Sequence, residues 1–368
     1  MGLKGYCEVG QSLVRKWRSW SRNPVSLWVR SLRSNAVLEA IAKASEERVP
    51  SVVLYNYPSF SGAYSALFAH LFHTYHNMPC LILPFSSAEP LRVEDLNIEG
   101  LETCYLLDFL CPKEFLLKLS QQLECKVVGF DHRKSVLPCI PDVNDCPENL
   151  TILVNLEKSS SSAVYEYFSA KHGDITVPDG AAPRLLDSKV RDRVELVLKY
   201  IEDGDLRRWS LPNIRAFNFG LGEWRSRFNC IANPYMYEQL LELTAEDLIA
   251  KGNSHLSFRQ SAANKLLGKV FRVRLGRGFY GECLGVRADE NSNLSDEIGK
   301  LLSVKSAAAG LRPIGAVIFM QRTNLKMCLR STDNATDTSE VAKAYGGGGS
   351  PSSSSFMIRM DEYNQWIR

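Results

Sequence analysis

Short apolar segments alternate with amphipathic segments through the first half of the chain. The apolar segments are rich in β-branched and aromatic residues, which is typical of buried strands. The segments between them repeat apolar residues at helical spacing. Strands joined by helices in this way favour an α/β fold with a doubly wound, mostly parallel sheet. The predicted strands are residues 51–57, 80–85, 103–109, 127–134 and 151–156, and the predicted helices are residues 63–75, 113–123 and 163–170.

Polar side chains follow two of these strands where each strand ends. Residues 127–134 read VVGFDHRK, so Asp131, His132 and Arg133 stand together directly after an apolar run. Asp108 ends the strand before it. Open α/β sheets bind their ligands at the carboxyl ends of parallel strands. The sequence therefore predicts a site at these strand ends, although an aspartate in this position also serves as a helix cap.

The pattern changes again after a helix predicted at residues 188–201. An acidic turn, EDGD, follows this helix, and residues 213–234 are expected to be a connection. A bridging helix is then predicted at residues 235–251. The expected organisation is a basic extension with a lead-in helix (residues 1–48), a first α/β domain (49–211), a linker with the bridging helix (212–255) and a smaller α/β domain (256–368).

A basic stretch opens the smaller domain. Residues 248–281 contain seven Lys and Arg residues and no acidic residue. The strand predicted there presents Arg272 and Arg274 on one face, and Arg277 follows with two aromatic residues. Such a surface suits a nucleic-acid backbone and its bases. A solvated basic face explains the same pattern, so both interpretations stay open.

A run of glycines lies near the end of the chain. Gly346, Gly347, Gly348 and Gly349 are followed by Ser350. Without a Cβ atom, backbone N–H groups can approach an anion closely. A flexible linker has the same composition, but the apolar residues that follow favour an ordered loop. The run is therefore interpreted as an ordered loop whose backbone can close on an anion.

Composition limits the classes of protein that fit the chain. Of the 368 residues, 45% are hydrophobic and 23% are charged, which suffices for two domains with substantial cores. The ten cysteines include no C-x-x-C pair, which favours buried thiols in a reducing, intracellular compartment over zinc or disulfides. No apolar run reaches the length of a membrane-spanning helix, so no membrane partner is expected.

The positive charge is concentrated at the beginning of the chain. Residues 1–35 contain seven basic residues and one acidic residue, so the net charge of +3 becomes −3 for the remainder. An Arg-rich, Ser-rich and acid-poor segment is typical of an organellar transit peptide, which indicates a mitochondrion or plastid. The alternative is a solvated basic helix in a cytoplasmic protein.

Taken in this order, the motifs resemble those of the DHH phosphoesterase superfamily. VVGFDHRK resembles its Asp-His-His motif. LRS, followed by AYGGGGSPSSSSF, resembles the Gly-Gly-Gly-His loop of the DHH-associated C-terminal domain. The resemblance covers residues 50–360 and includes an aspartate-ended strand before the first motif and an Asp-rich turn before a tryptophan.

The resemblance implies hydrolysis of phosphodiester or phosphoanhydride bonds, often in short oligonucleotides, with two divalent metals, usually Mn²⁺. It implies that Asp108, Asp131, His132 and Asp205 occupy metal-ligand positions, with Asp203 close enough to be an alternative to Asp205. Asp131 and His132 would then be catalytic. On the substrate side, it implies phosphate binding by Arg330 and the glycine run.

Three positions depart from the family pattern. The turn after the first strand has Ser61 where the family has acidic residues, and no acidic residue lies between Arg48 and Ser87. Arg133 replaces the third residue of the Asp-His-His motif, and Ser350 replaces the histidine of the glycine loop. The changes remove anionic ligands and add a fixed positive charge, which repels a cation and suits phosphate. We expect one weakly bound Mn²⁺ or none.

Three functional hypotheses follow from these departures. The preferred one is a degenerate relative that binds short oligonucleotides or nucleotides without cleaving them, with Arg133 and Ser350 added to the phosphate-binding residues. The second is an active, metal-dependent phosphoesterase that acts on short oligonucleotides. The third is a scaffold that uses the same fold to bind protein partners. Whether the chain is an enzyme stays open among them.

Overall fold

The computed structural model describes residues 35–86, 92–110, 113–123, 125–142, 145–175, 185–333 and 335–367. The predicted basic extension before residue 35 lies outside them. The chain divides into two compact units, Met1–Gly252 and Asn253–Arg368. Each unit is described below by itself.

The first unit is built on a five-stranded parallel sheet with the order β2-β1-β3-β4-β5. This arrangement confirms the predicted doubly wound α/β fold. Because the chain passes from β1 outward to β2 and then returns to β3, the strand order reverses between β1 and β3, where such sheets open a crevice. The strands are β1 (Ser51–Asn56), β2 (Cys80–Phe85), β3 (Thr103–Leu107), β4 (Lys126–Asp131) and β5 (Leu150–Val154).

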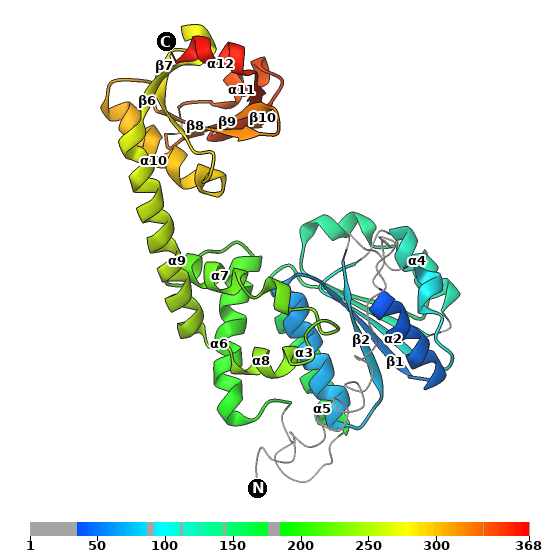
Figure 1. Ribbon diagram of the computed structural model, residues 1–368. Coiled ribbons are helices and arrows are strands. Elements are labelled where there is room, and N and C mark those ends of the chain that lie inside the picture. Colours follow the sequence, from blue (N-terminus) through cyan, green and yellow to red (C-terminus); the bar gives the residue numbers. More distant parts are fainter. Residues whose placement is uncertain are drawn as a thin grey trace, which may run out of the picture. The chain divides into compact units, whose positions relative to one another are not determined.

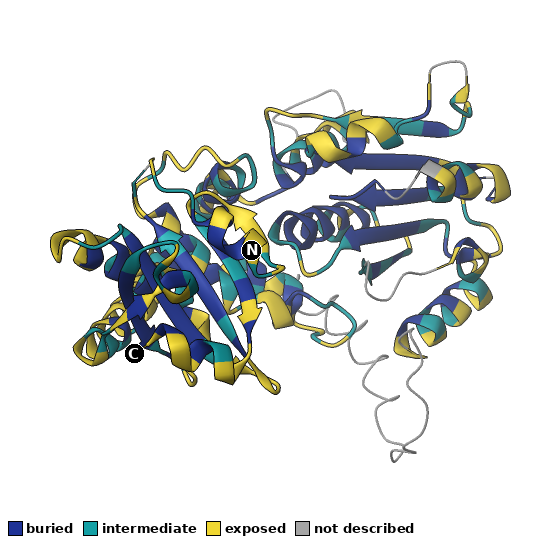
Figure 2. Cartoon of the chain, turned by 90° about the horizontal axis from the view of Figure 1, so that it is seen from above, coloured by how far each residue is buried: buried dark blue, intermediate teal, exposed yellow. Residues whose placement is uncertain are grey.

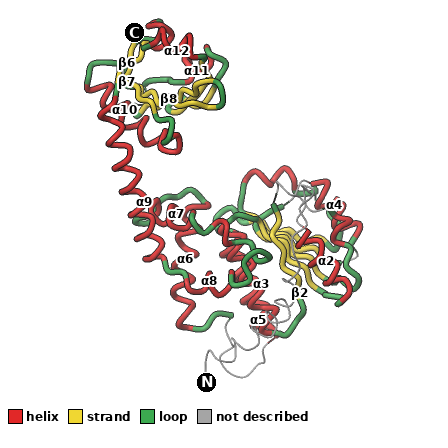
Figure 3. Tube along the Cα trace, in the orientation of Figure 1, coloured by secondary structure: helices red, strands yellow, loops and turns green. Residues whose placement is uncertain are grey.

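Helices cover both faces of this sheet (Figures 1 and 3). On β1, Val53 and Tyr55 belong to the core beneath α3 (Phe60–Tyr75) and α5 (Ser160–Ile175). Val52 and Leu54 belong to the opposite core, beneath α2 (Asn35–Glu46) and α4 (Lys113–Gln122). All four β1 side chains are fully buried, which explains why the strand reads as a continuous apolar run. Figure 2 shows strands coloured as buried along most of their length.

The first unit also contains four helices beyond α5, and here the structure differs from the expectations. Residues 213–234 contain α7, which packs Phe217 and Leu221 into the core. The predicted bridging helix is interrupted at Leu243, whose ψ of 133° is extended, and Thr244 caps the next helix by accepting a hydrogen bond from Asp247 N at 3.0 Å. The acidic EDGD segment is helical. The helices are α6 (Ser188–Asp205), α7 (Ile214–Gly222), α8 (Met236–Glu242) and α9 (Ala245–Leu266), the last of which continues into the second unit.

The second unit has a six-stranded mixed sheet with the order β10-β11-β9-β8-β7-β6. Helix α10 (Ser295–Ala308) covers one face, while α11 (Ser339–Ala344) and α12 (Met360–Trp366) contribute to the core on the other. Of the paired strands, β7 and β8 are parallel and the rest are antiparallel. The strands are β6 (Phe271–Arg274), β7 (Glu282–Arg287), β8 (Ile314–Gln321), β9 (Asn324–Ser331), β10 (Gly348–Ser350) and β11 (Ser353–Ile358).

Short 3₁₀ segments connect many of these elements: η1 (Val93–Leu96), η2 (Lys134–Cys139), η4 (Arg225–Arg227), η5 (Leu267–Lys269), η6 (Leu275–Gly278) and η7 (Ser292–Leu294). Among the residues with a described structure, no helix combines the length and the apolar character that crossing a bilayer requires.

Candidate functional site

Asp108 lies at the carboxyl end of β3, next to β1, where the strand order reverses. It follows the last residue of β3 in a left-handed conformation, with φ of 65°, and only 2% of it is exposed. Its Oδ2 accepts hydrogen bonds from Asn56 Nδ2 at 3.1 Å and from the Ser59 hydroxyl. Burial raises the pKa of this carboxyl, but the nearby His132 imidazole and the hydrogen bond from Ser59 oppose the effect and hold the pKa below its usual value.

Asp131, at the end of β4, is paired with Arg133. The guanidinium donates from Nε to Oδ1 at 2.9 Å and from Nη2 to Oδ2 at 2.6 Å. Its Nη2 also donates to the carbonyl oxygen of Asp108 at 3.0 Å. Backbone N–H groups of Leu110, His132 and Arg133 complete the set of donors to the Asp131 carboxylate, at 3.0, 2.7 and 3.0 Å.

His132 connects the two strand ends to helix α5. Its Nδ1 lies 2.8 Å from Ser160 Oγ and 3.3 Å from Asp108 Oδ1. Burial lowers the pKa of the imidazole, whereas the Asp108 carboxylate raises it, and the net shift is upward. The neighbouring carboxylates therefore stabilise the protonated imidazole.

Asp205, the last residue of α6, is the third carboxylate of the cluster. It accepts a hydrogen bond from the hydroxyl of Ser61, which in turn lies 3.2 Å from Ser161 Oγ. Burial, together with repulsion from Asp108, raises the pKa of Asp205 to about 6. The nearby Asp203 is not part of this cluster, because its carboxylate accepts from Ser210 N at 3.0 Å and from Leu211 N at 3.4 Å. The structure thus places Asp205 beside the strand ends.

These residues do not fit the metal centre that the family resemblance implies. Both oxygens of Asp131 are occupied by the Arg133 guanidinium and backbone donors. The hydroxyls of Ser59 and Ser61 approach Asp108 and Asp205 from the turn where the family has acidic residues. In the part of the chain that the structure describes, no three His, Cys, Asp or Glu side chains are grouped so that they could hold a metal ion.

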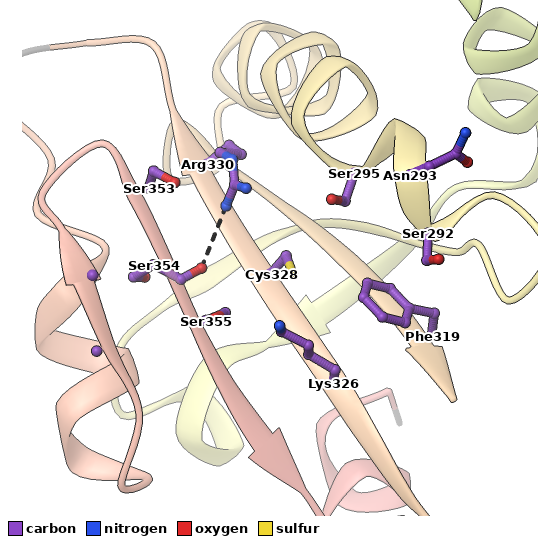
Figure 4. A pocket seen from close by; sticks show the side chains of 12 residues that line it. Ser292, Asn293, Ser295, Phe319, Lys326, Cys328, Arg330, Ser353, Ser354 and Ser355 are labelled. Atoms are coloured by element: carbon purple, nitrogen blue, oxygen red, sulfur yellow. Dashed lines mark hydrogen bonds between the residues drawn. The ribbon is translucent and has the colours of Figure 1, made fainter. Parts of the chain in front are cut away.

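A second polar site lies on the sheet of the second unit (Figure 4). It is a pocket of about 390 Å³ formed by β8, β9, β10, β11 and the segment before α10. Lys326 and Arg330 project into it from the same face of β9. Arg330 is held in place because its Nε donates to Asp296 at 2.9 Å and its Nη1 donates to Ser354 O at 3.4 Å. The remaining lining residues are Ser292, Asn293, Ser295, Phe319, Cys328, Gly348, Gly349, Ser353, Ser354 and Ser355.

The glycine run contributes only in part to this pocket. Gly348 and Gly349 line it, whereas Gly346, Gly347 and Ser350 are not among the lining residues. A Cβ atom on Gly347 would lie 2.2 Å from the carbonyl oxygen of Ser355. Close packing of the residue before β10 against β11 therefore explains this glycine without an anion. Gly346, with φ of 72°, allows the turn between α11 and β10.

The predicted basic face lies on the other edge of the same sheet, on β6 and the turn after it. Each of its arginines has an acidic neighbour. Arg272 and Arg274 lie 3.8 and 3.9 Å from Glu282, and Arg277 forms an ion pair with Glu362. Part of the positive charge is therefore balanced within the unit.

Several residues of the two sites were not singled out in the sequence. Asn56, Ser59 and Ser160 in the first unit and Lys326 in the second are the main ones. Residues 159–162 are four consecutive serines, and α5 begins within them at Ser160. This run of hydroxyl groups could have pointed to Ser160. Lys326 alternates along β9 with Arg330, so the strand period of two could have identified it.

Comparisons with known proteins give structural likenesses alone. No protein-family model matches the chain, and no curated protein is similar to it. Similar solved structures include an exopolyphosphatase-related protein from Bacteroides fragilis, with 12% identity over 92% of this chain and 96% of that one and a TM-score of 0.37. The pGpG-specific phosphodiesterase PggH from Vibrio cholerae has 12% identity, coverage of 86% and 95% and a TM-score of 0.40. CDC45 from Entamoeba histolytica has 10% identity, coverage of 89% and 97% and a TM-score of 0.38.

Proposed function

We propose that this chain is a degenerate relative of the DHH phosphoesterases that binds a phosphate-containing ligand, such as a nucleotide or short oligonucleotide, and does not cleave it through bound metals. The first unit keeps the carboxylates at its strand ends but neutralises them internally. The second unit supplies the cations that recognise the ligand.

The pairing of Arg133 with Asp131 is the observation that carries this proposal. A guanidinium fork saturates both oxygens of a fully buried carboxylate side chain. A metal ion could use Asp131 only after the ion pair and its hydrogen bonds were broken. Arg133 itself would remain nearby as a fixed positive charge that repels the metal.

The pocket of the second unit has the chemistry of a phosphate site. Its lining includes two cations, Lys326 and Arg330, and no acidic residue. Arg330 is positioned before a ligand arrives, so little side-chain entropy is lost on binding. Lys326 adds a second charge from the same face, and the hydroxyls of Ser353 and Ser355 add hydrogen-bond donors. Phe319 supplies the apolar surface that a sugar or base can contact.

The test is binding of a short fluorescein-labelled oligonucleotide, followed by fluorescence anisotropy in EDTA and in Mn²⁺. We expect binding that persists in EDTA and weakens with increasing salt. Arg330→Ala should weaken it about tenfold, because a charge-assisted hydrogen bond to phosphate is lost. Arg359→Ala is the matched control, since it removes an arginine whose side chain is 80% exposed and lies outside the pocket.

Product analysis in the same samples completes the test. The proposal predicts an intact oligonucleotide after incubation with Mn²⁺. Metal-dependent cleavage that is lost in Asp131→Ala would instead establish the active phosphoesterase and contradict the proposal.

A further inference from the structure

Trp209 stands in a strained segment directly after the carboxylate cluster. Three residues in the short stretch after α6 have a left-handed backbone, with φ of 54° at Arg207, 52° at Trp209 and 58° at Asn213. A bulky residue such as tryptophan rarely adopts this conformation. The indole is also exposed, since 53% of Trp209 is accessible to solvent.

Asp203 enforces this conformation from the last turn of α6. Before Trp209, the backbone N–H of Arg208 donates to the carbonyl oxygen of Asp203 at 3.0 Å. After Trp209, the backbone N–H of Ser210 donates to both carboxylate oxygens of Asp203 at 3.0 Å, and the Ser210 hydroxyl donates to the same carboxylate. The chain is thus anchored on both sides of Trp209, while the indole itself stays outside the core. Strained backbone that its surroundings enforce is concentrated at binding sites.

The segment is attached to the same end of the first unit as the site. Arg208 donates to the carbonyl oxygen of Glu157 at 2.6 Å and lies 3.5 Å from Glu202. Glu202 accepts from the backbone N–H of Ser159, which precedes the Ser160 that contacts His132. Arg207 and Arg208 are both exposed beside Trp209. An exposed indole that follows two exposed arginines in the chain suits a ligand that is planar and anionic.

We propose that Trp209 is a stacking platform for a nucleobase of a single-stranded nucleic-acid ligand. This inference rests on the proposed function, because it names the part of the ligand that the first unit contacts. This platform is separate from the pocket of the second unit. Its contribution to the binding free energy comes from stacking of the indole on the flat face of a base. Arg207 adds a positive charge two residues before Trp209 in the chain, whereas Glu202 balances the charge of Arg208.

The experiment compares a short fluorescein-labelled oligonucleotide with an abasic strand of the same length and charge. Wild-type protein should bind the base-containing strand about tenfold more tightly, as expected for one stacked base. Trp209→Leu should abolish this preference and leave the affinity for the abasic strand unchanged. Trp209→Phe should keep most of the preference, and circular dichroism checks that both variants are folded. Arg330→Ala should weaken both strands equally.

The outcomes separate this inference from the proposed function. Equal binding of the two strands by wild-type protein, or a preference that survives Trp209→Leu, would overturn the platform and leave the proposed function intact. Binding of neither strand by wild-type protein would overturn both.

Discussion

Three carboxylates, one imidazole and one guanidinium meet at the strand ends of the first unit. Asp108 and Asp131 are both 2% exposed, so their charges are separated from bulk water. A buried carboxylate needs a counter-charge or hydrogen-bond donors. In this chain Arg133, His132 and the hydroxyls of Ser59 and Ser61 supply them. The site is therefore a balanced network of the protein's own groups.

Removing the guanidinium should destabilise the fold. Arg133→Met keeps much of the side-chain volume but leaves the Asp131 carboxylate buried without its main partner. Loss of one member of a buried ion pair costs about 3–5 kcal/mol, and we expect about 3 kcal/mol because 41% of the Arg133 side chain is exposed. Urea denaturation measures this loss. Adding Asp131→Asn should recover part of it, whereas Lys134→Met, at an exposed neighbour, should change little.

Asp205 should make stability depend on pH. Its pKa of about 6 in the folded protein is above that of an unfolded aspartate, so the folded state binds the proton more tightly. The free energy of unfolding should then fall as the pH rises from about 4 to about 6, on the order of 2 kcal/mol. Asp205→Asn should remove this component and make the variant more stable than wild type at pH 7. Parallel pH profiles for the two proteins would contradict the assignment.

At the scale of elements, the edge strand β10 depends on glycine for its packing. A Cβ atom on Gly347 would lie 2.2 Å from the carbonyl oxygen of Ser355, and one on Gly349 would lie 2.3 Å from that of Ser353. A Cβ atom on Gly348 would have nothing within 4 Å. The two kinds of position alternate along the run, and Gly349 also has a φ of 142°, which favours glycine. The run thus has a structural role beside its contribution to the pocket.

This alternation gives a matched pair of substitutions. Gly347→Ala should destabilise the second unit by about 1–3 kcal/mol, because the added methyl group collides with backbone that cannot move aside. Gly348→Ala should be close to neutral for stability. Thermal unfolding of the two variants measures the difference. If both variants melted like wild type, β10 would not be packed as described.

At the scale of the whole molecule, the two units differ in charge and have separate cores. Residues 253–368 contain 16 basic and 10 acidic residues, for a net charge of +6, although the whole chain carries only +3. The core residues of the second unit all lie after residue 253. Its basic character agrees with a role in binding an anionic ligand.

The second unit should therefore fold when produced alone. A fragment of residues 253–368 keeps both of its core clusters and the whole pocket. We expect cooperative thermal unfolding followed by circular dichroism, and weaker but measurable oligonucleotide binding that Arg330→Ala reduces. Non-cooperative melting of the fragment would show that the unit depends on the rest of the chain.

Much of the fold could be predicted because its signals are local. The apolar run of β4 and its polar end are adjacent in sequence, so the position of Asp131 at a strand end followed from the pattern alone. Periodicity likewise located all five strands of the first sheet. Helix α7 was missed, because it begins in a segment without a clear cap. The bridging helix was predicted as one helix, because apolar spacing continues through Leu243, although the capping pair Thr244 and Asp247 marked the start of its second half.

The sequence by itself determined the α/β class, the strand order along the chain and the residue types at the strand ends. Only the tertiary structure decided which groups meet there. Ser61 and Asp205 are 144 positions apart, and Asn56 and Asp108 are 52 apart, so no local pattern joins them. The folded chain alone shows Arg133 turned back onto Asp131, and Asp205 rather than Asp203 in the cluster. The physical reason is that hydrogen bonds and ion pairs depend on direction and on distances of a few ångströms, which are fixed only when the elements pack.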